Sequence, residues 1–273
     1  MSPGGPTAAF FDLDKTIIAK SSTLAFSREF QAGGLISRGA VLRSAYAQFS
    51  YLVLGADHDQ MERLRQFMSR LSTGWDVQTV QEIVADALHN IVDPLVYAEA
   101  VRLIADHHEA GHDVIIVSTS GSEVVEPIGA MLGADHVVAT RMEVADGRYT
   151  GGITFYAYGE NKAVAVRQLA EERGYDLRRC SAYSDSITDE PMLSAVGHPF
   201  AVNPDRDLRR LAHQRGWPVL VFDKPVALRS RVRFPPVRQT AAVAGVVAVA
   251  SVGVLAWLGA RRRQDVIAAP TWA

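Results

Sequence analysis

Ala8-Ala9-Phe10-Phe11-Asp12-Leu13-Asp14-Lys15-Thr16 joins a short apolar run to two carboxylates and a hydroxyl. Uninterrupted apolar residues predict an inner strand of a parallel sheet, because such a strand is covered on both faces. Asp12 and Asp14 then lie at the carboxyl end of the strand, where open α/β sheets bind ligands. Two carboxylates this close repel each other unless a cation lies between them, and Mg²⁺ suits such oxygen ligands. Taken alone, the stretch also fits a strand followed by an Asp-rich turn.

Length and composition narrow the class of protein. The chain has 273 residues, 48% of them apolar, and a net charge of −2. This is enough for one large domain or two small ones with a packed core. The near-neutral charge argues against a nucleic-acid partner. The single cysteine, Cys180, cannot form an internal disulfide, and we expect a buried, unreactive thiol.

Residues 17–91 carry a helical pattern. Apolar residues recur at spacings of three and four, with breaks at Gly33-Gly34 and Gly55-Ala56-Asp57. The expected helices cover residues 17–30, 40–54, 60–68 and 78–88. Because this block interrupts the alternation of strands and helices, we interpret it as a helical cap inserted over the strand ends.

Strands and helices alternate from residue 92 onward. The patterns predict strands at 113–117, 136–139, 179–183, 199–202 and 217–222, helices at 93–110, 121–132, 160–173, 189–195 and 205–215, and a hairpin at 141–155. Repeated β-α units imply an α/β fold with a doubly wound, Rossmann-type parallel sheet. His107, His108 and His112 gather at one helix end, and we expect them to be solvated rather than bound to metal.

The carboxyl-terminal region differs in composition from the rest. Residues 239–260 contain no charged side chain and predict one transmembrane helix, at about 1.5 Å per residue. A buried core helix is the alternative, but it rarely lacks a polar face over such a length. Residues 224–238 form a basic, Pro-containing linker, and residues 261–273 form a short tail that begins with three arginines.

The membrane orientation follows from weaker indications. Residues 1–7 lack the basic and apolar blocks of a secretory signal. Basic residues are slightly more numerous before the predicted span than after it. We therefore expect a single-pass protein of the cell membrane with its large domain on the cytoplasmic side.

Four stretches together resemble the haloacid dehalogenase (HAD) superfamily, and its phosphoserine-phosphatase-like subfamily IB in particular. The resemblance covers roughly residues 8–223, and the order and spacing of the stretches fit the subfamily. The stretches are Asp12-Leu13-Asp14-Lys15-Thr16, Val114-Ile115-Ile116-Val117-Ser118, Gly159-Glu160-Asn161-Lys162 and Ser184-Asp185-Ser186-Ile187-Thr188-Asp189. The resemblance implies a HAD-like core over residues 1–16 and 92–223 and a substrate-covering helical cap over residues 17–91.

The resemblance also implies a role for each motif residue. Asp12 is the expected nucleophile, which forms an aspartyl-phosphate, and Asp14 the expected general acid and then base. Mg²⁺ is expected on Asp12, Asp185 and the backbone carbonyl of Asp14. The remaining assignments are phosphate binding for Ser118, Thr119 and Lys162, and a contact with a metal-bound water or with Lys162 for Asp189. Taken singly, Ser118 and Asp189 also suit helix N-caps, and Lys162 suits a solvated surface.

Two positions depart from the family pattern. Ser184 stands where the fourth motif usually has glycine. Ser21 stands where phosphoserine phosphatases have a glutamate that helps to bind the substrate's ammonium group. A hydroxyl cannot pair with an ammonium as a carboxylate does. We therefore expect this chain to share the reaction of phosphoserine phosphatases rather than their specificity for phosphoserine. Lys15 and Lys20 suggest a more anionic substrate.

The sequence therefore predicts a membrane-tethered, Mg²⁺-dependent phosphomonoesterase that acts on a small phosphorylated substrate or a lipid phosphate. Two alternatives stay open. One is a noncatalytic regulatory or binding module on a HAD fold, although the complete set of motif residues argues against it. The other is a phosphotransferase that uses the same aspartyl-phosphate with an alcohol in place of water.

Overall fold

The computed structural model describes residues 6–36, 66, 69–223 and 225, all of which belong to one unit, residues 1–232. The predicted helix at 40–54, most of the helix at 60–68 and the predicted span at 239–260 lie outside the described residues. Within the described part of the chain, no helix is long and apolar enough to cross a membrane.

β1 (Ala8–Phe11), the predicted first strand, lies in the middle of the sheet. The described residues form a seven-stranded sheet in the order β4-β3-β2-β1-β5-β6-β7. Neighbouring strands are parallel except β3 and β4, which form the predicted hairpin. The other strands are β2 (Asp113–Gly121), β3 (His136–Ala145), β4 (Arg148–Phe155), β5 (Ser181–Ser184), β6 (His198–Val202) and β7 (Val219–Leu220). The predicted α/β fold with a parallel sheet is therefore confirmed.

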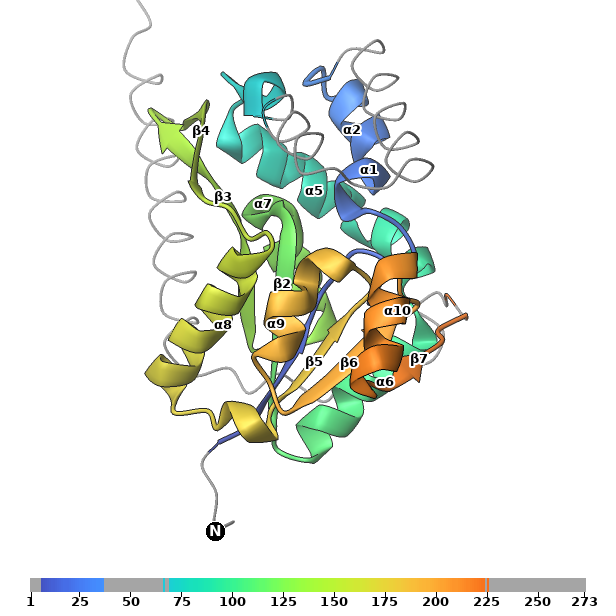
Figure 1. The fold of residues 1–273 in the computed structure, drawn as a ribbon. Coiled ribbons are helices and arrows are strands. Elements are labelled where there is room, and N and C mark those ends of the chain that lie inside the picture. Colours follow the sequence, from blue (N-terminus) through green and yellow to red (C-terminus); the bar gives the residue numbers. More distant parts are fainter. Residues whose placement is uncertain (1–5, 37–65, 67–68, 224, 226–273) are drawn as a thin grey trace, which may run out of the picture. The chain divides into compact units, whose positions relative to one another are not determined.

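Helices cover both faces of the sheet because successive side chains of β1 point to opposite sides. Ala8 and Phe10 pack in a cluster with α8 (Glu160–Arg173), α9 (Glu190–Ser194) and α10 (Arg206–Arg215), the helices in front of the strands in Figure 1. Ala9 and Phe11 pack on the other face, with α5 (Val77–Val92), α6 (Ala98–Glu109) and α7 (Ser122–Leu132). The sheet is doubly wound, as expected.

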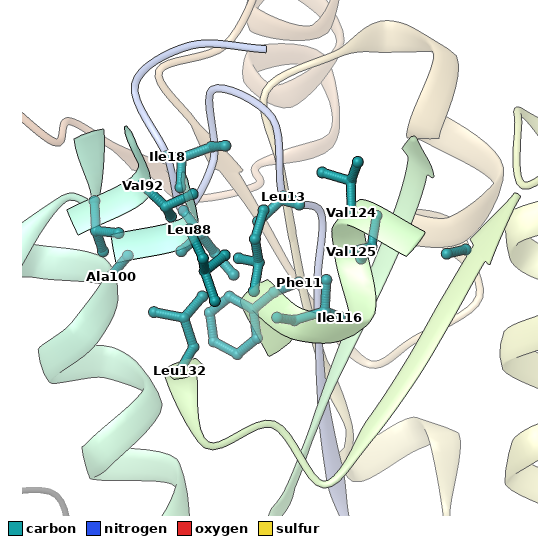
Figure 2. Close-up of a cluster of buried hydrophobic side chains, with 14 of the residues drawn as sticks. Phe11, Leu13, Ile18, Leu88, Val92, Ala100, Ile116, Val124, Val125 and Leu132 are labelled. Atoms are coloured by element: carbon teal, nitrogen blue, oxygen red, sulfur yellow. The ribbon is translucent and has the colours of Figure 1, made fainter. Parts of the chain in front are cut away.

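Figure 2 shows the second of these clusters at its centre. Phe11 and Leu13 from the first motif lie among Ile116 of β2 and Leu132 of α7. Leu88 and Val92 of α5 belong to the same cluster. The strand that carries the first motif is thus held by apolar contacts from the sheet, from a covering helix and from the helical block.

The helical block begins differently from the prediction. Residues 17–30 form two short helices, α1 (Ser22–Ala25) and α2 (Ser27–Ala32), in place of one continuous helix. Before them, the amides of Ile17 and Ile18 both donate to the carbonyl of Leu13, in a turn that directly follows the first motif. This turn leaves residues 17–21 outside any helix.

The helix predicted at 93–110 is also divided. A 3₁₀ turn, η1 (Asp93–Leu95), precedes α6, and Val96 and Tyr97 between them are extended. The amide of Tyr97 donates to the carbonyl of Ile17 at 2.9 Å, and Ile18 forms a bridge with Val96. These long-range backbone contacts override the local helical pattern.

The hairpin β3–β4 turns at Asp146 and Gly147, whose φ angles of 50° and 74° are both left-handed, as a type I′ turn requires. The carbonyl of Gly147 accepts from the amide of Val77 at 3.0 Å, and Tyr149 exchanges backbone hydrogen bonds with Gly74 and Trp75. The hairpin therefore holds the start of α5, the long helix of the helical block.

Candidate active site

The predicted site residues meet at the carboxyl ends of three neighbouring strands. Asp12 follows β1, and Asp185 follows β5. Ser118 lies near the end of β2. β1 lies between β2 and β5, so the strand order reverses at β1, and open α/β sheets bind ligands outside the carboxyl ends of the strands at such a point. The amide of Asp12 donates to the carbonyl of Tyr183 at 2.9 Å, which ties the first motif to the strand before the fourth.

Lys162 joins the first and fourth motifs. Its Nζ atom donates to Asp12 Oδ1 at 2.7 Å and to Asp189 Oδ2 at 2.8 Å. The lysine is 1% exposed and Asp189 is 2% exposed. The idea of a solvated Lys162 is therefore wrong. Although burial opposes a charged lysine, the two carboxylates raise its pKa and keep it protonated.

Asp12 and Asp185 are buried carboxylates that repel each other. Burial raises the pKa of Asp12, and Lys162 opposes that rise. Burial also raises the pKa of Asp185, to about 8, and the charge of Asp12 adds to this effect. Both carboxylates therefore need a further positive charge to be ionised together at neutral pH. Oxygen ligands with this need fit a hard divalent cation such as Mg²⁺.

Within the described residues, no three acidic, histidine or cysteine side chains are placed to enclose a metal ion. The ligand set implied by the resemblance contains two side chains, of Asp12 and Asp185, and one backbone carbonyl, of Asp14. A Mg²⁺ ion usually keeps several waters and binds through one or two carboxylates, so the two side chains present are compatible with it.

The side chain of Asp14 is held on both oxygens. Its Oδ1 atom accepts from the amide of Ser22 at 2.5 Å, and its Oδ2 atom accepts from the hydroxyl of Ser120 at 2.8 Å. Ser22 begins α1, whereas Ser120 lies near the end of β2. The carboxylate is thereby oriented by two elements that are far apart in the sequence.

The second motif ends in an irregular stretch rather than at a helix start. β2 continues to Gly121, and its pairing with β3 shifts between Ser118 and Gly121. The Ser118 hydroxyl accepts from the amide of Ser120 at 3.2 Å, so it is not the N-cap of α7. The Thr119 hydroxyl donates to the carbonyl of Ala157 at 2.9 Å. The Thr119 hydroxyl is therefore engaged by the chain itself.

In the fourth motif, Ser184, which stands in place of the usual glycine, makes a hydrogen bond within the site. The Ser184 hydroxyl is buried and donates to Asp189 Oδ2 at 2.7 Å. Asp189 occupies the N-cap position of α9, but its side chain makes no capping bond and instead accepts from Lys162 and Ser184. Of the two contacts expected for Asp189, the one with Lys162 is present in the structure.

The two lysines of the first segment differ in position. Lys15 has a left-handed φ of 64° and lies close enough to Asp185 for its charge to lower the pKa of that carboxyl. Lys20 is exposed. Of these two lysines, Lys15 therefore adds positive charge beside the carboxylates.

Sequence reasoning did not predict the contacts of three serines in the site. Ser22 and Ser120 bind Asp14, and Ser184 binds Asp189. The runs Ser21-Ser22-Thr23 and Ser118-Thr119-Ser120 are rich in hydroxyls and flank the first and second motifs. These hydroxyl-rich runs beside the motifs could have indicated a hydrogen-bonding cluster. The sequence does not show that the two runs meet at Asp14.

The histidines near α6 also differ from the prediction. His107 is buried, and its Nε2 atom lies 2.8 Å from the Tyr183 hydroxyl, while its Nδ1 atom lies 2.9 Å from His112 Nδ1. The expectation of a solvated side chain is therefore wrong for His107, because α6 turns this residue toward the sheet. Cys180 is buried, as expected.

Acidic residues and a buried lysine at the switch point of a doubly wound sheet define an α/β enzyme of the kind that handles anionic substrates. The family model for haloacid dehalogenase-like hydrolases matches residues 9–194. The chain belongs to this family.

Proteins similar to this chain include one that is named a phosphatase. One from Streptomyces azureus, named "inhibition of morphological differentiation protein", is 61% identical over 95% of each chain. One from Mycobacterium tuberculosis, named "probable phosphatase", is 59% identical over 91% of this chain and 85% of its own length. A solved structure of a protein of unknown function from Bordetella pertussis has a TM-score of 0.69 at 29% identity, over 79% of this chain and 98% of that chain. The prediction of a phosphatase of this superfamily is confirmed.

Proposed function

We propose that the chain hydrolyses phosphomonoesters in two steps, through a phosphorylated Asp12. The observation that carries the proposal is the contact of Lys162 Nζ with Asp12 Oδ1 at 2.7 Å in a buried site. A fixed ammonium beside the carboxylate lowers the cost of bringing it to an anionic phosphoryl group. Because Lys162 holds Oδ1, we assign the attack to Oδ2.

In the first step, Asp12 Oδ2 bonds to phosphorus, the ester P–O bond breaks, and Asp14 gives its proton to the leaving alkoxide. In the second step, Asp14 takes a proton from a water molecule that attacks the phosphorus. The bond to Asp12 then breaks and inorganic phosphate leaves. Asp14 suits both steps because Ser22 and Ser120 hold its orientation.

Residues of this chain also supply the binding of the phosphoryl group and of a metal. Ser118, the backbone N–H of Thr119 and Lys162 are the proposed phosphate ligands. Asp12, Asp185 and the backbone carbonyl of Asp14 would hold Mg²⁺, which neutralises the negative charge that accumulates when substrate binds. Asp189 keeps Lys162 in place.

The test is Asp12→Asn in the full-length protein. An amide cannot attack phosphorus, so turnover of a panel of phosphomonoesters should fall below detection while the circular dichroism spectrum stays unchanged. Beryllofluoride, which mimics the phosphorylated carboxylate, should inhibit the wild type, and EDTA should abolish its activity. Asp207→Asn, an exposed carboxylate on α10, is the matched control and should retain wild-type turnover. Turnover by Asp12→Asn near the wild-type rate would refute the mechanism.

We propose a small phosphomonoester without an essential ammonium group, or a lipid phosphate, as substrate. Ser21 offers a hydroxyl where phosphoserine recognition uses a carboxylate, and Lys15 adds positive charge near Asp185. Relatives at 33% and 30% identity are named phosphoserine phosphatase and histidinol-phosphatase. Relatives at this level of identity are therefore named for different substrates. A competition assay with phosphoserine should show little or no preference for it. The same assay with glycerol as acceptor tests the phosphotransferase alternative.

We propose a core over residues 1–16 and 92–223, a cap over residues 17–91, and a single span over residues 239–260 that keeps the enzyme at the cytoplasmic face. The uncharged composition of the span supports its place in a membrane. Full-length protein should sediment with membranes and need detergent for release. Its recovery in the soluble fraction would refute the tether and leave the phosphatase proposal intact.

A further inference from the structure

A cluster of three hydroxyls meets one oxygen of Asp14 through Ser120. Ser120 Oγ lies 2.8 Å from Asp14 Oδ2, 2.9 Å from Ser22 Oγ and 3.1 Å from Thr23 Oγ1. Ser22 is 0% exposed and Ser120 is 9% exposed, so the bond between the two serines is buried, and the bonds of Ser120 to Asp14 and Thr23 are partly buried. Buried hydrogen bonds of this kind polarise one another and fix the groups that make them.

The direction of each bond follows from the number of protons. A serine hydroxyl has a single proton, and the Oδ2 atom of Asp14 accepts the proton of Ser120 whether the carboxyl is ionised or carries a proton of its own. The proton of Ser120 therefore goes to Asp14, and the hydroxyls of Ser22 and Thr23 must donate to Ser120. The result is a directed chain from α1 through Ser120 to the carboxylate, in which each donor stabilises the next.

The cluster connects the helical block to the core. Ser22 and Thr23 lie in α1, at the start of the block, and Ser120 lies near the end of β2. The backbone of Ser22 also holds the other oxygen of Asp14, at 2.5 Å. The orientation of the carboxylate thus depends on α1 being seated against the end of β2.

We propose that Ser120 is a positioning residue for proton transfer by Asp14, and that seating of α1 and orientation of the acid are one event. The inference rests on the proposed role of Asp14. A general acid is effective only when it is held within hydrogen-bond reach of the leaving oxygen, and small errors in position are costly. Ser120 supplies this constraint without contact with the reacting atoms.

The proposal makes the effect of Ser120 depend on the leaving group. An alkyl phosphate releases a strongly basic alkoxide that needs a proton as the ester bond breaks. p-Nitrophenyl phosphate releases a weakly basic phenolate that leaves without one. A defect in fold, metal binding or phosphate binding affects both substrates alike, whereas a misplaced acid affects the alkyl ester more.

The test compares kcat/KM for glycerol 2-phosphate and p-nitrophenyl phosphate, because this constant reports the step in which the leaving group departs. In Ser120→Ala, kcat/KM for glycerol 2-phosphate should fall about tenfold more than for p-nitrophenyl phosphate, a part of the usual contribution of a general acid. Ser22→Ala removes one donor to Ser120 but keeps the backbone bond to Asp14, so it should show the same discrimination, reduced in size. If Ser120→Ala does not fold, Ser22→Ala carries the test.

Ser122→Ala is the matched control, since the Ser122 hydroxyl is not among the groups that contact Asp14 in the described part of the chain. It should leave the ratio of the two constants at the wild-type value. Equal losses for both substrates in Ser120→Ala, or an unchanged ratio in both cluster variants, would overturn the inference. Activity in Asp12→Asn would instead refute the proposed function on which it rests, so the two failures are distinguishable.

Discussion

At the scale of single residues, the site is a balance between buried charges. Lys162 lies between Asp12 and Asp189, and Ser184 adds a second donor to Asp189. A buried carboxylate needs such donors, because each unpaired oxygen retains a desolvation penalty. The serine that departs from the family pattern is therefore part of the network that holds Lys162 beside the proposed nucleophile.

Ser184→Ala should test that contact. Loss of the hydroxyl leaves Asp189 with one donor fewer, and Lys162 is then held less firmly. We expect the free energy of unfolding to fall by about 1–3 kcal/mol and kcat to fall several-fold with little change in KM. Urea denaturation and steady-state kinetics measure the two effects.

Ser194→Ala is the control for Ser184→Ala. Ser194 lies at the end of α9, and its hydroxyl makes exposed hydrogen bonds with Glu190 and Arg215. This variant should change neither quantity appreciably, because exposed hydrogen bonds contribute little. Wild-type stability and kcat in Ser184→Ala would show that Asp189 holds Lys162 without help.

At the scale of elements, the hairpin β3–β4 connects the sheet to the helical block. Its two-residue turn depends on left-handed backbone at Asp146 and Gly147, and the carbonyl of Gly147 receives the amide that begins α5. The turn thus determines both the register of the hairpin and the place where the long helix of the block starts.

Gly147→Ala should destabilise the protein through the backbone alone. No atom lies within 4 Å of the position that a Cβ would occupy, so the cost is that of left-handed φ, about 1–2 kcal/mol. Urea denaturation measures it. Gly147→Asn is the matched variant and should lose less, because asparagine tolerates this conformation. Equal stability of the alanine variant and the wild type would mean that the turn can change its type without loss.

At the scale of the whole molecule, His107 joins three parts of the fold. It belongs to α6, contacts Tyr183 of β5 through Nε2, and meets the ring of Phe11 of β1 edge-on at 5.9 Å. Burial lowers its pKa to about 4, the neighbouring His112 acts in the same direction, and Asp106 opposes them. The folded protein therefore keeps His107 neutral where the unfolded chain protonates it.

This difference predicts the sign of a pH dependence. Because the folded pKa lies below the unfolded value of about 6.5, the unfolded chain binds more protons between the two values. The contribution of His107 to stability is complete above the unfolded pKa and is lost as pH falls toward 4. The unfolding free energy should thus decrease between about pH 7 and pH 5.

His107→Gln should reduce that decrease, because glutamine does not titrate. The exposed His213→Gln is the control and should retain the wild-type slope. Denaturant titrations at both pH values measure the difference. A slope in His107→Gln equal to that of the wild type would assign the pH dependence to other groups.

Local patterns determined most of the elements and the composition of the site. α8 was predicted with its observed bounds, because Gly174 can adopt the left-handed φ of 75° that ends it. β1 and the hairpin turn likewise follow from short-range order, namely apolar runs and turn residues. Asp185 and Lys162 were assigned to the site through the resemblance of four motifs to the family, since Lys162 by itself looked solvated. The proposed roles of these residues, the metal and the membrane span remain predictions.

Long-range contacts decided the rest, because nothing in a local pattern reports which distant groups will meet. The pairing of Tyr97 with Ile17 divided a helix that its own residues favour. Packing of α6 on the sheet buried His107, which looked solvated by composition. Folding brought Ser22 and Ser120, 98 residues apart, to the same hydroxyl cluster at Asp14. Only tertiary structure decides such contacts, since their free energy depends on burial and on partners that no stretch of sequence contains.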